Sequence, residues 1–407
     1  MIEVADRSVP AHVPPSLVRA WPLTRQAPTT DDPFDVIIPR LHEGPEVFFA
    51  LDGFAPGIHS WIFRRAEDIR AIYLDTEHFS SNGRPALSAI IGDSWTIIPV
   101  DTDASDHSAY RALLNPLFTP KRMAALEGDA RQLARKLIGQ FARRGHCEFI
   151  SDFARPLPVT VFLSLMGFPL GRVDEFLEWE AAIIAAPDLP PRERALRNIK
   201  AFLLEEIAVR RRNPGDDLLS ELMRGGPSAH APSDTELLGM ATNLFLGGLD
   251  TITSTAAWHF KHLATHPEHQ TTLRSDPALI PQALEELLRA FALVSMQRRC
   301  VKAKTIRGVT VLPGDLVTVS TPLAARDPAA YDRPNDIVLD RAPTHITFAY
   351  GPHRCLGSHL ARRELLIMLQ EFLAGIGVFR IAPGAVLPMH FGGQMGLDAL
   401  PLVWDAP

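Results

Sequence analysis

One cysteine stands in a segment whose neighbours could hold its sulfur as a reactive thiolate. The segment reads Phe348-Ala-Tyr-Gly-Pro-His-Arg-Cys355-Leu-Gly357, and the apolar-periodic run Ser358 to Phe372 follows it. A turn rich in Gly and Pro would place Cys355 just ahead of a helix, near unpaired backbone N–H groups and the positive end of the helix dipole. Both effects favour the thiolate form of the sulfur.

The residues around Cys355 predict a flat ligand. Gly351 permits the turn, and Gly357 has no side chain, so a planar molecule could approach the backbone closely. Phe348 could cover the sulfur on its other side, and His353 could donate to an anionic group on the rim of the ligand. A flat ligand with an anionic rim, bound through sulfur, suggests haem with Cys355 as the axial ligand of its iron.

A lone cysteine is more often a small buried apolar residue, so the surroundings of this one have to decide. The pattern Phe-x-x-Gly-x-His-x-Cys-x-Gly resembles the cysteine-ligand loop of the cytochromes P-450, the haem-thiolate monooxygenases. Similarity covers most of the chain, roughly residues 40 to 405, and is closest to the soluble bacterial branch typified by the camphor hydroxylase. The resemblance implies a mostly helical, triangular fold with a small β portion.

A second motif lies in the middle of a long predicted helix. Ser233-Asp-Thr-Glu236 forms a capping box, and no proline interrupts the run before Pro267, which predicts a helix of roughly 33 residues. Its centre holds two adjacent glycines, Gly247 and Gly248, which cost about 1 kcal/mol each relative to alanine. They indicate either a local defect or a close helix crossing.

The residues after the glycines favour a defect with chemistry. Thr251 lies four residues after Gly247 and can bond its carbonyl, which opens the helix ladder, while Asp250 beside it could relay protons from solvent. Gly-Gly-x-Asp-Thr resembles the oxygen-activation groove of the same family. There the acid and the alcohol deliver the protons that cleavage of O2 consumes, so Asp250 and Thr251 are predicted to be catalytic.

Cationic side chains elsewhere could hold the carboxylates of a cofactor. His107 and Arg111 stand at i and i+4 on one helical face, which on its own is more often a solvated surface. The resemblance implies that they clamp a haem propionate, a task for which the guanidinium fork is suited. Arg298 corresponds to a second propionate-binding arginine, although the adjacent Arg299 leaves the assignment open by one position.

A scaffold is predicted behind the cofactor. Glu286 and Arg289 stand at i and i+3, a common pairing worth at most about 1 kcal/mol when exposed. The resemblance implies a buried network that Arg341 completes. We therefore assign these three residues to support and not to chemistry.

Candidate substrate contacts follow from comparison with the camphor-hydroxylating type. Trp95 stands where a ketone-binding tyrosine is expected, and Asn243 where an apolar residue is expected; either could instead pack away from the site. Predicted apolar walls are Leu244, Leu246 and Val294. A terpenoid or norisoprenoid ketone is the predicted substrate, because such a pocket takes a compact hydrocarbon with one or two polar contacts.

The order of helical and extended patterns along the chain predicts a mostly helical protein with a small β portion, which places it in the α+β class. Residues 1–35 are expected to form an irregular arm, and residues 36–407 a single domain with a β-rich subregion at about 40–65 and 299–320. Two strands are predicted at 46–51 and 59–63.

Composition excludes several classes of function. The formal charge of −6 argues against general nucleic-acid binding, and three widely spaced cysteines fit a reducing compartment without disulfides. No run approaches the ~20 apolar residues of a membrane span, so a cytoplasmic protein is expected. It is also expected to be a monomer.

The resemblance implies a monooxygenase that receives NAD(P)H-derived electrons through a reductase and an iron–sulfur ferredoxin. Arg111 and Arg354 could present positive charge to an acidic ferredoxin. Two alternatives remain open: a haem-thiolate protein that binds or senses a ligand without turnover, and a cysteine hydrolase using Cys355 with His353 or His359.

Overall fold

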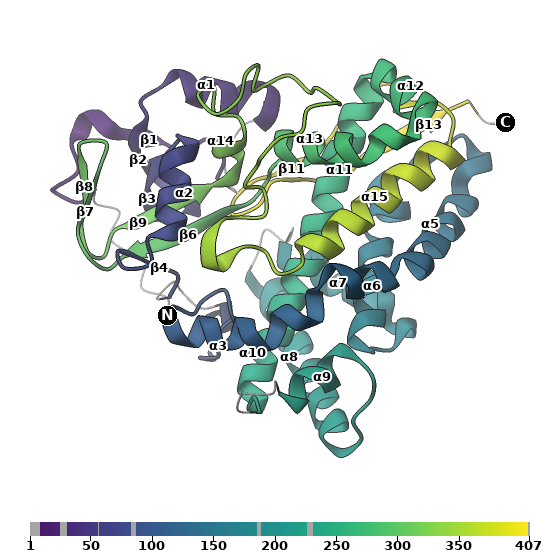
Figure 1. The fold of residues 1–407 in the computed structure, drawn as a ribbon, viewed down its shortest axis with the longest axis horizontal. Helices are drawn as coiled ribbons and strands as arrows, with labels where there is room; N and C mark the ends of the chain where they lie inside the picture. The colour runs from purple at the N-terminus through teal and green to yellow at the C-terminus, as the bar shows by residue number, and fades with distance from the viewer. Residues whose placement is uncertain are drawn as a thin grey trace. The chain divides into compact units, whose positions relative to one another are not determined.

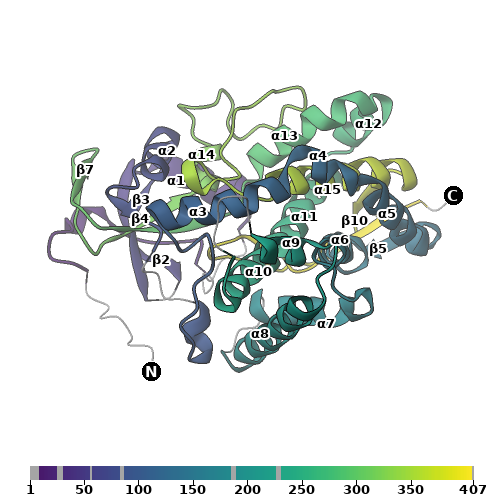
Figure 2. The same ribbon diagram turned by 60° about the horizontal axis from the view of Figure 1, so that its bottom comes forward.

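Helices dominate the computed structural model, which describes residues 9–24, 31–55, 57–82, 87–184, 189–225 and 231–405 (Figures 1 and 2). The helices are α1 (Ile38–Glu43), α2 (Ala66–Leu74), α3 (Ala104–Leu114), α4 (Pro120–Ala125), α5 (Glu127–Phe141), α6 (Pro156–Met166), α7 (Val173–Ile184), α8 (Leu189–Arg212), α9 (Leu218–Arg224), α10 (Asp234–Gly248), α11 (Asp250–Thr265), α12 (Pro267–Ser275), α13 (Ile280–Ala290), α14 (Thr321–Ala325) and α15 (Ser358–Gly375). This confirms the predicted α-rich class. Of the helices so described, none combines the length and apolar character that crossing a bilayer requires.

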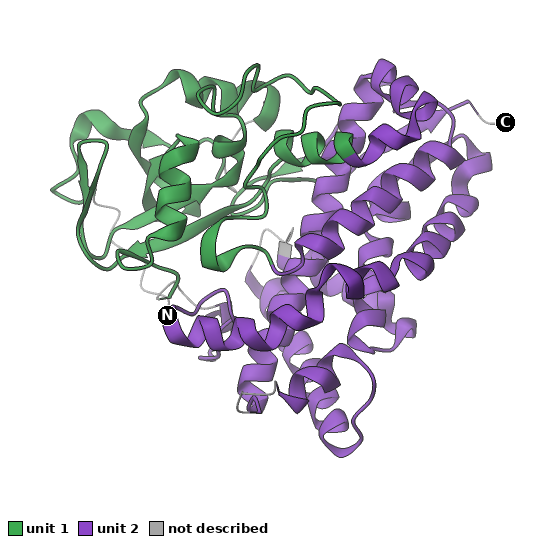
Figure 3. Cartoon of the chain, viewed as in Figure 1, with its two compact units in different colours: residues 1–84, 282–355, 389–397 green, residues 85–281, 356–388, 398–407 purple. Residues whose placement is uncertain are grey.

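Short strands make up the β portion. They are β1 (Val18–Ala20), β2 (Val47–Ala55), β3 (Ile58–Phe63), β4 (Phe79–Ser80), β5 (His146–Glu148), β6 (Ser295–Cys300), β7 (Lys304–Ile306), β8 (Val309–Val311), β9 (Leu316–Ser320), β10 (Phe379–Ile381), β11 (Met389–His390), β12 (Gly396–Leu397) and β13 (Pro401–Trp404). Contacts along the chain divide it into two compact units, which Figure 3 colours separately. Unit 1 comprises residues 1–84, 282–355 and 389–397, and unit 2 comprises residues 85–281, 356–388 and 398–407.

Unit 1 is built on a six-stranded sheet with the order β1-β2-β3-β9-β6-β4. The predicted strand pair forms as β2 and β3, which run antiparallel, and the predicted β segment near 299–320 supplies β6, the hairpin β7–β8 and β9. Strand β9 runs parallel to β3, and a buried hydrogen bond of 2.8 Å joins Ser60 Oγ to Thr318 Oγ1 between them. The sheet therefore ties residues near 60 to residues near 318.

The predicted irregular arm contributes a strand, which corrects the expectation for part of residues 1–35. Strand β1 pairs parallel with β2, placing Val18 opposite Phe49. The edge of β2 offers unpaired backbone groups that any extended segment can use, so the arm needs no strand-forming sequence of its own. Residues 1–8 and 25–30 of the predicted arm lie outside the described residues.

Unit 2 contains α3–α12 and α15 together with a three-stranded sheet, β10-β13-β5, that the sequence did not predict. Helices α5 and α15 lie side by side in Figures 1 and 2, and Arg131 and Arg135 of α5 bind Glu371 of α15 at 2.6 and 2.7 Å. The rings of Phe149 and Phe260 stack at 4.3 Å in the core beneath them. These three strands have three or four residues each, too few to show an alternating pattern.

The predicted long helix is present but interrupted. Helix α10 begins with the expected capping box of Ser233 and Glu236, ends at Gly248, and resumes as α11 at Asp250 after the single residue Leu249. Elsewhere on α10, the backbone carbonyl of Thr96 would lie 2.2 Å from a Cβ atom at position 239. Glycine at this position therefore allows the segment that contains Trp95 to lie against the helix.

Gly239→Ala is expected to lower the free energy of unfolding by about 1–3 kcal/mol, because the new methyl group must displace a backbone carbonyl. Gly139→Ala in α5 is the matched control, since no atom lies within 4 Å of the Cβ position. That control should raise the free energy of unfolding by about 1 kcal/mol through helix propensity. Urea titration of both variants checks the pair, and equal stabilities would contradict the packing argument.

Candidate active site

The cysteine loop is fixed against α2 within unit 1. The backbone N–H of Cys355 donates to the carbonyl of Phe348 at 2.8 Å, which closes the loop. Gly351 has φ +69°, and a Cβ atom there would lie 3.0 Å from the carbonyl of Tyr73. Glycine is therefore required by both the backbone angle and the close approach. The loop presents Cys355 as an exposed residue.

The three cysteines differ in their fitness to act as thiolates. Cys147 and Cys300 are buried, and burial raises the pKa of each thiol, which keeps both protonated. The Cys300 thiol also donates to the carbonyl of Lys302 at 3.1 Å. Cys355 is exposed, so its sulfur is accessible to a ligand. The residue that the motif singled out is thus the accessible one.

Two further predicted cofactor contacts lie in unit 1. His353 Nε2 is 3.1 Å from Ser81 Oγ, and Arg298 is only 4% exposed. Arg298 Nη1 donates to the carbonyl of Gln297, and the guanidinium carbon lies 5.3 Å from the ring centroid of Tyr73. A buried guanidinium remains charged and favours an anionic partner. Sequence reasoning missed Ser81 and Tyr73, because partners separated by more than two hundred residues leave no local signal.

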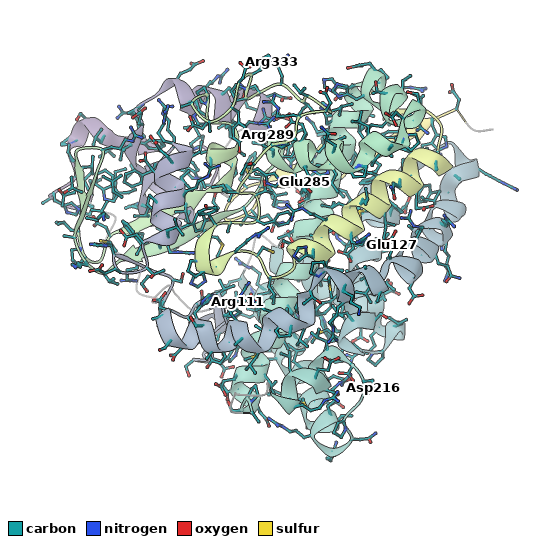
Figure 4. The ribbon with its side chains drawn as sticks, in the orientation of Figure 1. Arg111, Glu127, Asp216, Glu285, Arg289 and Arg333 are labelled. Atoms are coloured by element: carbon teal, nitrogen blue, oxygen red, sulfur yellow. The ribbon has the colours of Figure 1, made fainter. Side chains whose placement is uncertain are left out.

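The predicted scaffold forms a buried charge network. The carboxylate of Glu286 accepts two hydrogen bonds from Arg289, both 2.8 Å, and a third of 3.0 Å from Arg341 Nε. Glu286 and Arg289 have no exposed side-chain surface. Arg289 also donates to the carbonyls of Ala325, Pro334 and Asp336, so the helix is bound to the irregular segment before the cysteine loop. Figure 4 labels Arg289 on α13.

Helix α3 in unit 2 carries the predicted His107 and Arg111. His107 is buried at 4% exposure and Arg111, labelled in Figure 4, is half-buried, so neither stands on a fully solvated face. Both fall within Ala104–Leu114, which confirms the helical spacing. Their role toward a propionate stays a prediction.

The interruption of the long helix has the predicted hydrogen bond. Thr251 Oγ1 donates to the carbonyl of Gly247 at 2.8 Å, and Thr253 Oγ1 donates to the carbonyl of Leu249 at 3.1 Å. Gly247 is exposed, and no atom lies within 4 Å of its Cβ position. A Cβ atom at Gly248 would lie 3.7 Å from the ring of Phe162, which is an ordinary van der Waals contact. A close approach therefore requires glycine at neither position, and Gly247 leaves open space beside the interruption.

Asp250 follows the interruption at the start of α11. It is 5% exposed, and Ser254 Oγ lies 3.4 Å from its Oδ1 atom. The arrangement holds an acid and an alcohol, Asp250 and Thr251, on consecutive residues where the backbone ladder is open. Such a pair can pass a proton.

The predicted substrate residues lie on two segments of unit 2 and one of unit 1. Trp95 is 7% exposed, and its indole nitrogen has no hydrogen-bond partner among the residues the structure describes. Asn243, Leu244 and Leu246 of α10 are partly exposed. Val294 lies in unit 1, where its carbonyl accepts from both the backbone N–H and the hydroxyl of Thr321.

The side chains present fit a haem b group. An exposed cysteine supplies the axial sulfur, and no atom lies within 4 Å of the Cβ position of Gly357, which leaves the backbone accessible to a flat molecule. Arginine and histidine side chains, buried or partly buried, supply donors suited to carboxylates: His107, Arg111, Arg298 and His353. Cys355 and Arg298 belong to unit 1 and Thr251 and Arg111 to unit 2, so their service in one site stays a prediction.

Known proteins resemble the chain over almost its whole length. The family model described as Cytochrome P450 matches residues 187–376. The chain is 35% identical over 407 residues to the probable cytochrome P450 127A1 of Sinorhizobium fredii, with 98% of each chain covered. It is 33% identical over 364 residues to the mycinamicin IV hydroxylase/epoxidase of Micromonospora griseorubida, covering 86% of this chain and 90% of that one.

Solved structures give the same result for the fold. The crystal structure of cytochrome P450 CYP101C1 matches with a TM-score of 0.87 and 32% identity, covering 98% of this chain and 100% of the other. CYP101J2 matches with a TM-score of 0.87 and 28% identity over the same shares.

Glu286→Ala is expected to lower the free energy of unfolding by about 3–5 kcal/mol, because it leaves the buried guanidinium of Arg289 without its carboxylate. Arg333→Ala is the control, since its 3.9 Å pair with Asp336 is exposed and worth at most about 1 kcal/mol. Thermal and urea unfolding of both variants measure the difference. A Glu286 variant as stable as the Arg333 variant would show that the network contributes little.

Proposed function

The chain belongs to the cytochrome P450 family, and we propose that it hydroxylates a terpenoid or norisoprenoid ketone with electrons from a ferredoxin. As a P450 monooxygenase it carries haem b, which supplies the activation of O2. In the proposed reaction one oxygen atom enters a C–H bond and the other leaves as water, which consumes two electrons and two protons. Cys355 would bind the iron, and His107, Arg111, Arg298 and His353 would hold the propionates.

The observation that carries the substrate proposal is the buried indole N–H of Trp95. A buried donor without a partner costs about 1–3 kcal/mol, which an acceptor on a bound substrate would recover. The Thr96 carbonyl lies against α10 at Gly239, so Trp95 adjoins the helix that carries Asn243 one turn later. A ketone oxygen is a compact acceptor for such a donor.

Apolar side chains on the same helix support a hydrocarbon body. Leu244 and Leu246 of α10 are partly exposed and can give up contact with water to a substrate. Each Å² of apolar surface removed from water contributes about 25 cal/mol, while the polar contact sets the orientation. A compact ketone with one oxygen and a hydrocarbon skeleton meets both requirements.

Proton delivery falls to Asp250 and Thr251. The Thr251 hydroxyl is held by the Gly247 carbonyl, and the Asp250 carboxylate stands on the preceding residue beside Ser254. A proton accepted by the carboxylate from the solvent side can pass to the hydroxyl and on toward the reacting oxygen. Electrons would arrive from an acidic ferredoxin drawn to exposed cations such as Arg354.

The substrate proposal is tested with β-ionone and with the hydrocarbon in which a CH2 group replaces its carbonyl. Binding is measured by the change in haem spin state, and hydroxylated products are identified in a reaction reconstituted with ferredoxin and reductase. Trp95→Phe should weaken binding of the ketone about tenfold and leave binding of the hydrocarbon nearly unchanged. Equal losses for both molecules would mean that Trp95 only shapes the pocket.

Thr251→Ala is expected to keep haem uptake and substrate binding while diverting most reducing equivalents to hydrogen peroxide, because the hydroxyl that passes the proton is gone. The ratio of product formed to NAD(P)H consumed measures this coupling. Thr255→Ala, which removes a hydroxyl bonded to the Thr251 carbonyl at 2.6 Å, is the control one turn later. Unchanged coupling in the Thr251 variant would contradict the relay.

A further inference from the structure

A glutamate on α7 occupies a position that the helix pattern reserves for an apolar side chain. Phe176, Trp179 and Ile183 form the buried stripe of α7, and Glu180 lies between them on the same face. Its side chain is 3% exposed, and neither carboxyl oxygen has a hydrogen-bond partner among the described residues. An unpartnered buried carboxylate would cost several kcal/mol, so its surroundings require an explanation.

Glu180 is surrounded by residues that contact α10 and the start of α11. On α7, one turn before it, Phe176 packs against Phe245 of α10 with ring centroids 5.6 Å apart. Asp250 stands at the start of α11, about one turn before Thr253, and its charge acts on Glu180. Arg155 Nε lies 3.7 Å from Glu180 Oε2, and the carbonyl of the preceding residue, Ala154, is 3.4 Å from the hydroxyl of Thr253 on α11.

We propose that Glu180 is the proton donor to Asp250, a role that rests on the proposed function of Asp250 and Thr251. Glu180 does not touch the reacting atoms and acts through its neighbour. It extends the proton path from the interrupted helix to α7, so that the path has two carboxyl groups in series. Ordinary glutamate chemistry suffices, because the donor needs only to hold a proton and release it to a carboxylate.

The transfer balances with the groups present. The O–H bond of the Glu180 carboxyl breaks and an O–H bond forms on Asp250, with water bridging any gap longer than a hydrogen bond. The carboxylate left on Glu180 is stabilised by the guanidinium of Arg155, whose side chain is 27% exposed and reaches solvent. A proton from water then restores the Glu180 carboxyl.

Burial and the charge of Asp250 favour the protonated form of the Glu180 carboxyl. Burial first, and then the charge of Asp250, raise the pKa of Glu180 to about 8 from an ordinary value of 4.5, while Arg155 acts in the opposite direction. The helix α8, which also packs on α7, contributes the aromatic ring of Phe202. Arg172 stacks on that ring and is paired with Glu175. Glu180 therefore holds a proton near neutral pH.

The protonated state has a direct signature in the holoenzyme. Infrared difference spectra between about pH 5 and about pH 10 should show a buried carboxylic acid band that disappears as Glu180 ionises. The part of the band that belongs to Glu180 should be absent in Glu180→Gln and retained in Glu178→Gln, a change at an exposed neighbour on the same helix. Burial also raises the pKa of Glu364, whose carboxyl contributes equally to the parent and to both variants. Asp250→Asn should shift the midpoint of the Glu180 titration to lower pH, because it removes the negative charge that raises the pKa of Glu180. Identical spectra for the parent and Glu180→Gln, or an unmoved midpoint, would overturn the proposal.

Stability gives a second readout without turnover. The folded chain keeps a proton on Glu180 that the unfolded chain loses above about pH 4.5, so folding is destabilised progressively as pH rises from there to about 8. Glu180→Gln should remove this part of the pH dependence in urea unfolding. A pH profile unchanged from the parent would contradict a protonated Glu180.

Measurements of turnover distinguish a Glu180 that donates protons from a Glu180 that only stabilises the fold. With β-ionone as the substrate, Glu180→Gln should lower coupled product formation by about tenfold or more and enlarge the solvent deuterium isotope effect. Haem content and the spin-state change should stay near those of Glu178→Gln, and Glu180→Asp should restore part of the coupling. Full coupling in Glu180→Gln overturns the donor role. Absence of turnover in every variant would reject the proposed substrate class, and the infrared midpoint would still decide whether the two carboxyls communicate.

Discussion

The hydrogen bond from the Thr251 hydroxyl to the Gly247 carbonyl occupies the point where α10 ends and α11 begins. A side-chain donor takes a carbonyl that the backbone ladder would otherwise use, and Leu249 stands between the two helices with φ −102° and ψ −70°. The interruption is narrow because both helices are otherwise well formed, α10 by its capping box and α11 by a nearly fully buried body. The chemistry proposed for Asp250 and Thr251 depends on this local loss of regular structure.

Buried charge recurs around the functional residues of both units. In unit 1, Glu286 is satisfied by two arginines and by the backbone N–H of Val338, so its charge is fully compensated. In unit 2, Glu180 has Arg155 at 3.7 Å, and the charge of Asp250 acts on it. The first arrangement fixes structure because every partner is saturated, whereas the second leaves a proton able to move.

The sequence predicted the residues whose signals are local. The capping box, the glycine pair and Thr251 fall within one short stretch, residues 233–251, and all lie where the pattern indicated. Glu286 and Arg341 are far apart in the chain, yet the family resemblance supplied their contact, which the structure contains. Strand β1 and the sheet β10-β13-β5 escaped prediction, since their pairing depends on edges provided by distant segments. Glu180 had a readable sign, a carboxylate within an apolar stripe, but its partners Arg155 and Asp250 came only with the tertiary structure.

The close approach at Gly239 also bears on how this protein can diverge. Any side chain at position 239 would collide with the carbonyl of Thr96. Glycine therefore cannot be replaced there when the protein evolves toward new substrates. Variation is instead directed to the next turn of α10, where Asn243, Leu244 and Leu246 are partly exposed. Under the proposed function, a change of substrate in descendants of this chain would come from exchange of those three side chains, while the path of the backbone past them stays the same.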